Sequence, residues 1–261
     1  MNNDPNDSFS QRFYSLKKAQ KRRAGVPLYT LYLNRPVGGL IAAASPRFVT
    51  PNVLTLIGAV FTYLSIVLLM FFAQSNVIGW SVIGILLVVG FFFDSADGQL
   101  ARLRNRGSIS GEWLDHVLDS GRIALIHVAT LWFLLRNEVV PPTLAVVVCA
   151  IFGLCSVVVF FGGILFDQLL PAKKTKVSEE NLNADERKRL LVRAILMIPV
   201  DYGVLCWAFV LLPWPMIFFG TYIVLGLAQS GICVLLLGKW YRLLRAEDAA
   251  RFADRRIDEL R

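Results

Sequence analysis

Apolar runs of about 20 residues recur along the chain, and this spacing most constrains how it folds. A helix of that length crosses the hydrocarbon core of a bilayer, which is about 30 Å thick. The chain is 56% hydrophobic with a mean hydropathy of +0.56, above the roughly 45–50% apolar content of a soluble domain. We predict an all-α polytopic membrane protein with about six transmembrane helices, at 53–73, 78–98, 112–135, 141–166, 193–213 and 215–238.

The segments outside these runs are expected at the membrane surface. Residues 10–24 are basic with scattered aromatics, and 28–44 are apolar but interrupted by polar residues. Both predict an interfacial amphipathic helix near the N-terminus. The final segment alternates charged with apolar residues and predicts a surface helix. The chain is therefore divided into an N-terminal cytoplasmic segment (1–52), a six-helix transmembrane domain (53–238) and a C-terminal amphipathic helix (239–261).

The basic residues predict the orientation of the chain. Of 27 Lys and Arg, 25 fall before 53, within 94–110, within 168–193 or after 238. The positive-inside rule then places both termini and the loop after Asp94 in the cytoplasm. A net charge of +8 distributed between apolar runs suits anionic lipid headgroups, so membrane lipid is the expected partner and nucleic acid is not. No cleavable signal peptide is expected.

Four aspartates mark the junction of the second and third runs. The sequence from Asp94 to Asp119 follows D-x-x-D-G-x-x-A-R-x(8)-G-x-x-x-D-x-x-x-D. Asp94 and Asp97 share one helical face, as do Asp115 and Asp119. Carboxylates at the end of membrane helices are costly unless they serve a function or pair with a cation, and hard cations such as Mg²⁺ or Mn²⁺ prefer oxygen ligands. The ordinary alternative is neutralisation by nearby arginines.

All eight positions of this pattern match the signature of the CDP-alcohol phosphatidyltransferases, integral membrane enzymes of phospholipid biosynthesis. The chain therefore resembles that family over these 26 residues, and its helical plan is similar over most of its length. The matching positions are Asp94, Asp97, Gly98, Ala101, Arg102, Gly111, Asp115 and Asp119.

The resemblance implies a role for each matching residue. Asp94, Asp97, Asp115 and Asp119 would bind two divalent cations, Mg²⁺ or Mn²⁺, which clamp the diphosphate of a CDP-alcohol. Asp119 would also be the catalytic base that takes the proton of an acceptor hydroxyl. The nucleotide site would comprise Asp97, Gly98, Ala101, Arg102 and Gly111, with Arg102 as a phosphate donor.

Two polar residues at the start of the first apolar run are further candidates for nucleotide binding. Asn52 and Thr55 follow Thr50 and Pro51, which predict a helix start at the depth of the acids. Helix capping explains Asn52 and Thr55 equally well.

Three residues are candidates for binding the acceptor. Arg122 shares a helical stripe with Asp119 and either holds the acceptor or neutralises an acid. Arg193 is a candidate for contacting a phosphorylated acceptor, although an arginine that reaches back to the interface explains it as well. Asp201 is an acid within an apolar run, so it either lines a pocket or is a hydrogen-bonded structural residue.

The resemblance implies transfer of a phosphatidyl group from CDP-diacylglycerol to a hydroxyl acceptor, with release of CMP. Relatives use CDP-choline, CDP-ethanolamine or CDP-inositol, so these donors remain alternatives. An intramembrane prenyltransferase would need two widely separated acidic motifs, and a transporter would place its acids near the midplane. Relatives are commonly homodimers, which makes a homodimer a candidate state. In a bacterial cell the protein would lie in the plasma membrane.

Overall fold

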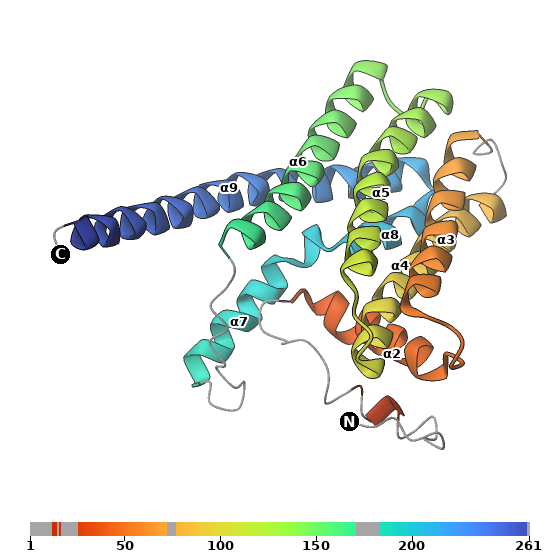
Figure 1. Cartoon of the computed structure of the whole chain (residues 1–261). Coiled ribbons are helices and arrows are strands. Elements are labelled where there is room, and N and C mark those ends of the chain that lie inside the picture. Colours follow the sequence, from red (N-terminus) through yellow and green to blue (C-terminus); the bar gives the residue numbers. More distant parts are fainter. Residues whose placement is uncertain (1–11, 15, 17–25, 72–76, 171–182, 260–261) are drawn as a thin grey trace.

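The computed structural model describes residues 12–14, 16, 26–71, 77–170 and 183–259. Most of the interfacial helix expected at 10–24 lies outside the described residues. Within them every regular element is helical and no strand is present, which confirms the all-α prediction. The helices over 51–71, 77–104, 109–136 and 142–169 stand side by side, and the last helix of the chain crosses them and extends away (Figure 1).

The elements follow the predicted apolar runs closely. Among the described residues, five helices are long and apolar enough to cross a membrane: α3, α4, α5, α6 and most of α9. The protein is a multi-pass membrane protein. In chain order the elements are η1 (Thr30–Asn34), α2 (Arg35–Ala44), α3 (Pro51–Phe71), α4 (Val77–Arg104), α5 (Ile109–Arg136), α6 (Pro142–Leu169), α7 (Ala184–Leu196), η3 (Ile198–Val200), α8 (Tyr202–Ala208), η4 (Phe209–Leu211) and α9 (Pro215–Glu259).

The run at 193–213 is not the continuous spanning helix that we predicted. Its first residues belong to the charged helix α7, and Pro199 lies in the 3₁₀ turn η3. Asp201 then caps α8, accepting a hydrogen bond from the Gly203 N–H at 2.9 Å. A proline, which cannot donate a backbone hydrogen bond, and a capping acid divide the run, so a broken segment replaces the sixth long helix.

The broken segment still follows α4 for much of its length. The Tyr202 ring packs on Phe91 of α4 with ring centroids 5.3 Å apart. Eight residues after Tyr202, the Val210 nitrogen would lie 2.5 Å from a Cβ on Gly84, which is seven residues before Phe91 on α4. Because seven residues of helix rise about 10 Å, the two stretches run antiparallel through the interior of the bundle.

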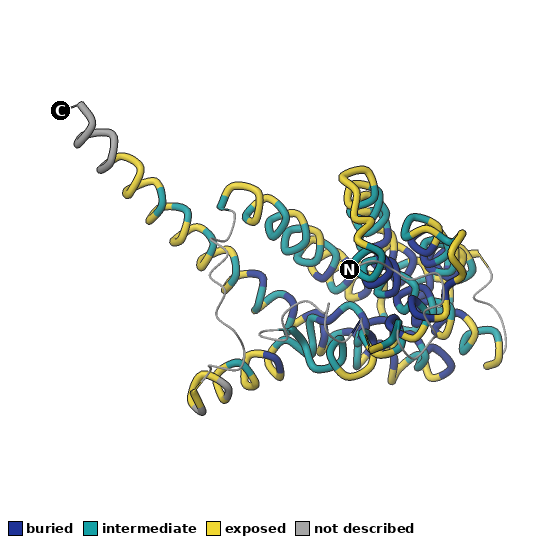
Figure 2. Tube along the Cα trace, turned by 60° about the horizontal axis from the view of Figure 1, so that its bottom comes forward, coloured by how far each residue is buried: buried dark blue, intermediate teal, exposed yellow. Residues whose placement is uncertain are grey.

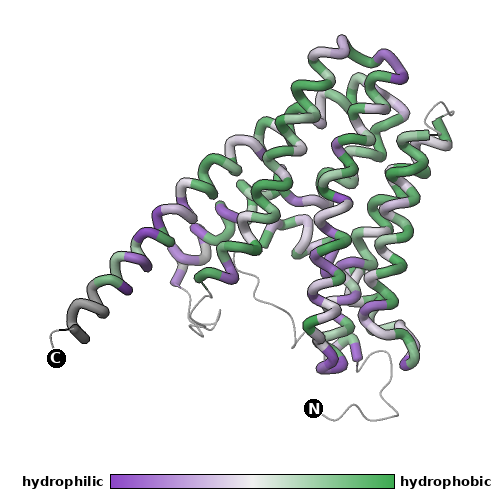
Figure 3. Tube along the Cα trace, turned by 45° about the horizontal axis from the view of Figure 1, so that its top comes forward, coloured by the Kyte–Doolittle hydropathy of each residue, from purple (hydrophilic) through white to green (hydrophobic). Residues whose placement is uncertain are grey.

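The C-terminal segment is helical over its described part. Residues from 239 to 259 continue the 45-residue helix α9. Trp240 stacks on Phe166 of α6, with ring centroids 5.8 Å apart. Beyond this contact α9 extends away from the bundle, and its residues up to 252 are mostly exposed (Figure 2, Figure 3).

Glycines bring α3 and α4 into close contact. A Cβ on Gly58 would lie 2.9 Å from the Gly90 carbonyl oxygen, and a Cβ on Gly90 would collide with the Thr62 hydroxyl. Neither position can therefore hold a larger residue without separating the helices. This close packing sets α3 beside the acidic end of α4.

The segment 28–44 is helical, as predicted, and packs against α4. Gln99 of α4 donates a hydrogen bond to the Arg35 carbonyl at 2.9 Å. The Arg104 guanidinium donates to four carbonyls of the turn between α2 and α3, those of Ser45, Pro46, Arg47 and Val49. Arg104 thus fixes the start of α3 to the end of α4.

Candidate active site

The four predicted aspartates lie on two adjoining helix ends. Asp94 and Asp97 are in the last turns of α4, and Asp115 and Asp119 are in the first turns of α5. Asn105 joins the helices with a φ of 50°, a left-handed conformation that asparagine tolerates. Ser108 caps α5 by accepting a hydrogen bond from the Gly111 N–H at 3.0 Å. A turn of a few residues therefore brings the two acid pairs to one end of the bundle.

A cavity of about 620 Å³ opens between these helix ends, within the usual range of 300–1,000 Å³ for ligand pockets. We call it the outer cavity. All seven residues predicted to bind the nucleotide line it, together with Asp115 and His116. The seven are Asn52, Thr55, Asp97, Gly98, Ala101, Arg102 and Gly111.

Both residues at the start of α3 contact the motif. The Thr55 hydroxyl donates a hydrogen bond to Asp97 Oδ2 at 2.6 Å. A Cβ on Gly111 would lie 2.8 Å from Asn52 Oδ1, so the glycine allows α3 to approach α5. Thr55 therefore orients an acid. The sequence had suggested nucleotide binding or helix capping for Thr55, and not this role.

Arg122 is buried between two of the acids. Its guanidinium contacts Asp94 Oδ1 at 3.0 Å and Oδ2 at 3.3 Å, and Asp119 Oδ1 at 2.8 Å. The rings of Tyr202 and Phe91 lie 4.6 and 5.6 Å from its central carbon, which adds a cation–π attraction. Arg122 neutralises acids here, which is one of the two roles that the sequence suggested.

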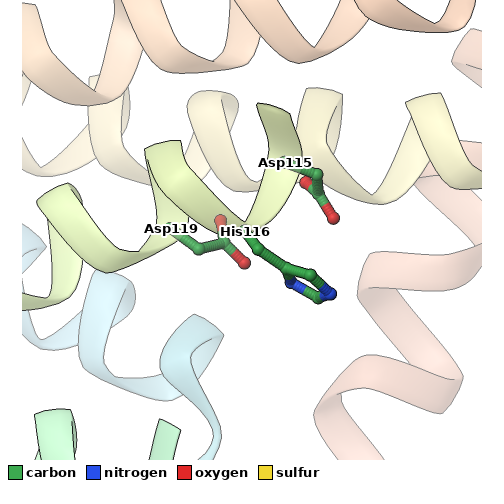
Figure 4. Close-up of side chains that lie close together, drawn as sticks. All are labelled: Asp115, His116 and Asp119. Atoms are coloured by element: carbon green, nitrogen blue, oxygen red, sulfur yellow. The ribbon is translucent and has the colours of Figure 1, made fainter. Parts of the chain in front are cut away.

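The residues present fit a divalent cation. Asp115, His116 and Asp119 each offer a ligand atom, and these atoms lie within 4.8 Å of one another (Figure 4). The His116 Nδ1 is buried and has no hydrogen-bond partner among the described residues. Two carboxylates and one imidazole suit Mn²⁺, and Mg²⁺ if oxygen ligands complete the shell. Asp97 and Asp115 line the outer cavity, whereas Asp94 and Asp119 are both engaged by Arg122.

The other two acceptor candidates lie away from the outer cavity. Arg193 is exposed near the end of α7 and lines neither of the two larger cavities. Asp201 lines a second, inner cavity and accepts hydrogen bonds from the Thr30 hydroxyl at 2.6 Å and the Thr30 N–H at 3.3 Å. Burial raises the pKa of the Asp201 carboxyl, although the bonds from Thr30 and Gly203 act in the opposite direction.

Three contributors to the site were not predicted. His116 follows Asp115 inside the motif, and its imidazole next to an acid was a signal available in the sequence. Phe91 and Tyr202 stack on Arg122, but they come from helices far apart in the chain. No local spacing could reveal that contact.

Comparisons with known proteins agree with this geometry. The chain is 29% identical to human ethanolaminephosphotransferase 1 over 102 residues (35% of this chain), and 35% identical to cholinephosphotransferase 1 of Danio rerio over 92 residues (33%). It is 39% identical to archaetidylinositol phosphate synthase of Pyrococcus horikoshii over 71 residues (27%). The matches span only 26%, 24% and 35% of those relatives.

A sequence model of the CDP-alcohol phosphatidyltransferase family covers much more of the chain. It matches residues 48–231, from the turn before α3 into α9. This range includes all four aspartates, both cavities and the broken segment. The chain therefore belongs to the CDP-alcohol phosphatidyltransferase family.

Proposed function

We propose that this enzyme transfers a substituted phosphate group from a CDP-alcohol to a hydroxyl acceptor and releases CMP. The outer cavity carries the proposal. Acids from both α4 and α5 line it, and its α4 wall includes Gly98 and Ala101, whose small side chains leave room beside the helix for a cytidine. Arg102 lines the same wall and offers a donor to phosphate oxygens.

Asp94, Asp97, Asp115 and Asp119 would hold the divalent cations, with His116 as a further ligand. Bound cations would supply charge neutralisation for the diphosphate. Thr55 keeps Asp97 turned toward the cavity through its hydrogen bond. Two cations are part of the proposal, and Arg122 would compete with them for the oxygens of both Asp94 and Asp119.

Asp119 is proposed as the base. Its carboxylate would accept the proton of the acceptor hydroxyl while the acceptor oxygen forms a bond to the phosphorus of the substituted phosphate. The bond from that phosphorus to the bridging oxygen of CMP breaks, and CMP leaves with the electron pair. Arg122 contacts Asp119 Oδ1 at 2.8 Å and thereby fixes its orientation.

CDP-diacylglycerol is the proposed donor. A second candidate is CDP-ethanolamine or CDP-choline with diacylglycerol as acceptor, because two of the relatives are named as ethanolamine- and cholinephosphotransferases. The basic ends of the chain support a cytoplasmic site with both termini on that side. Arg193 and Asp201 remain proposed acceptor contacts, and a homodimer remains the proposed assembly.

The test is a CMP-release screen with purified protein in Mn²⁺ or Mg²⁺. Donors are CDP-diacylglycerol, CDP-ethanolamine, CDP-choline and CDP-inositol, each with soluble hydroxyl acceptors and with diacylglycerol. Asp119→Asn is expected to lower kcat by at least about 100-fold. Asp167→Asn, a change at an exposed acid near the end of α6, should leave the rate unchanged. Absence of CMP with every pair, or full activity of Asp119→Asn, would refute the proposal.

A further inference from the structure

A second cavity of about 190 Å³ lies inside the bundle and has no assigned role. We call it the inner cavity. Helices α5, α6 and α9 and the broken segment form its walls. His127 lines it eight residues beyond Asp119 on α5, or about 12 Å further along the helix axis. The lining residues are Ile123, His127, Phe152, Ser156, Val159, Phe160, Pro199, Val200, Asp201, Tyr202, Leu205 and Gln229.

Two polar wall residues are left without a hydrogen-bond partner among the described residues. The Tyr202 hydroxyl is buried and unpartnered. Gln229 is only 6% exposed and its amide makes no hydrogen bond with any described residue, but its amide atoms are not fully enclosed by protein. Buried polar groups usually have a partner from the protein, from solvent or from a ligand, so both groups are available to a molecule in the cavity. By contrast, Asp201 is satisfied by Thr30 and Gly203.

Two further polar groups face the same space. The His127 Nδ1 and the Tyr222 hydroxyl are hydrogen-bonded at 2.5 Å. The other ring nitrogen, Nε2, can therefore donate or accept a second hydrogen bond. Ser156 adds a hydroxyl from α6. A few polar groups within walls of Phe, Val, Leu and Ile are typical of a site that binds an amphiphilic ligand.

The lining determines what kind of group fits. Among the described residues no Lys or Arg lines the cavity, whereas Asp201 does, so this lining would repel a phosphate rather than bind it. At about 190 Å³ the cavity is below the usual 300–1,000 Å³ of a pocket for a drug-sized ligand, so it suits a small unit rather than a whole lipid. A neutral glycerol with its ester or hydroxyl oxygens matches both the polar groups and the apolar wall.

The inner cavity is joined to the acids by direct contacts. Tyr202 lines the cavity and stacks on Arg122, which contacts Asp94 and Asp119. Building on the proposed function, we propose that the inner cavity binds the neutral glycerol-ester unit of a glycerolipid substrate, with Gln229 as its hydrogen-bonding residue. The unit belongs either to free diacylglycerol or to the lipid half of CDP-diacylglycerol.

Photo-cross-linking tests the site without relying on turnover. The probe is a diacylglycerol that carries a diazirine close to the glycerol, added to the purified full chain in detergent. Adducts are expected on α6 near Ser156 and on α9 near Gln229. If only dioleoylglycerol reduces the labelling, the cavity is an acceptor site. If only CDP-dioleoylglycerol reduces it, the cavity is a donor site. Labelling spread over all lipid-facing helices, or resistant to both competitors, would overturn the proposal.

A matched pair of variants tests the role of Gln229. Gln229→Leu keeps the size and removes the amide, and should reduce labelling and raise KM for the lipid substrate about tenfold, the effect of one hydrogen bond. The KM of the water-soluble substrate and the Mn²⁺ affinity should not change. Ser230→Ala is the control, because the Ser230 hydroxyl bonds to Gly226 of its own helix.

The outcomes separate this proposal from the proposed function. If no pair releases CMP while competed labelling persists near Gln229, the lipid site stands and the proposed reaction falls. If CMP is released but Gln229→Leu retains both labelling and lipid KM, the reaction stands and the proposed role of Gln229 falls.

Discussion

Removing the charge of Arg122 should destabilise the metal-free protein strongly. Arg122 is 8% exposed and makes three contacts of 2.8 to 3.3 Å with Asp94 and Asp119. Breaking a buried ion pair by removing one partner costs about 3–5 kcal/mol. At 2–4 °C per kcal/mol for a chain of this size, Arg122→Gln should lower Tm by on the order of 10 °C.

Divalent cations should reverse much of that loss. Arg122 occupies Asp94 and Asp119 with its own positive charge, so it competes with any cation for the same oxygens. Arg122→Gln should therefore bind Mn²⁺ several-fold more tightly, and saturating Mn²⁺ should raise its Tm by more than that of the unaltered protein. Thermal unfolding in detergent, with EDTA or Mn²⁺, and Mn²⁺ titration by electron paramagnetic resonance provide the two readouts.

Arg136→Gln is the control, at the far end of the same helix. Arg136 is exposed and donates to the Phe71 carbonyl at 3.1 Å, so its replacement should change Tm by only a few degrees and leave Mn²⁺ affinity unchanged. Equal Tm losses in the two variants without metal, or an unchanged Mn²⁺ affinity in Arg122→Gln, would refute the idea that Arg122 is a counter-cation at the metal site.

Three further changes test other contacts. Thr55→Val removes the hydrogen bond to Asp97 and should weaken Mn²⁺ binding about threefold to tenfold, measured by the same titration; equal affinity would dismiss that contact. Gly90→Ala should cost about 1–3 kcal/mol because its Cβ collides with Thr62, seen as a lower Tm; an unchanged Tm would contradict close α3–α4 packing. Asp201→Ala loses a helix cap and the Thr30 bond and should cost about 2 kcal/mol; the measurement is denaturant unfolding, and a midpoint equal to the unaltered protein's would count against it.

The sequence predicted the long helices and the gathering of the acids for a clear reason. Both depend on local information: run length predicts a span, and the i, i+3 and i, i+4 spacings place Asp94 with Asp97 and Asp115 with Asp119. The turn through Asn105 is short, so the two acid pairs must lie near each other. Local patterns were sufficient here.

The sequence was less informative where distant segments meet. The mean hydropathy over 193–213 is insensitive to Pro199 and Asp201. These residues break the helix because proline has no backbone N–H and because Asp201 caps a new helix start. The inner cavity combines residues from 123 to 229, and the Tyr202–Arg122 stack joins α8 to α5. Such contacts depend on how the helices cross, which no spacing rule encodes.

The broken segment has a consequence for how the chain enters the membrane during synthesis. Tyr202–Leu211 is the only described apolar helix in the 10–17-residue range, and it follows an acid, so it lacks the length of about 20 residues that an insertion machinery recognises. The segment therefore depends on packing against α4 for its place in the bundle. Gly84 makes that packing possible, because a Cβ at this position would lie 2.5 Å from the Val210 nitrogen. A larger residue at 84 would push the short segment away from the helix that holds it.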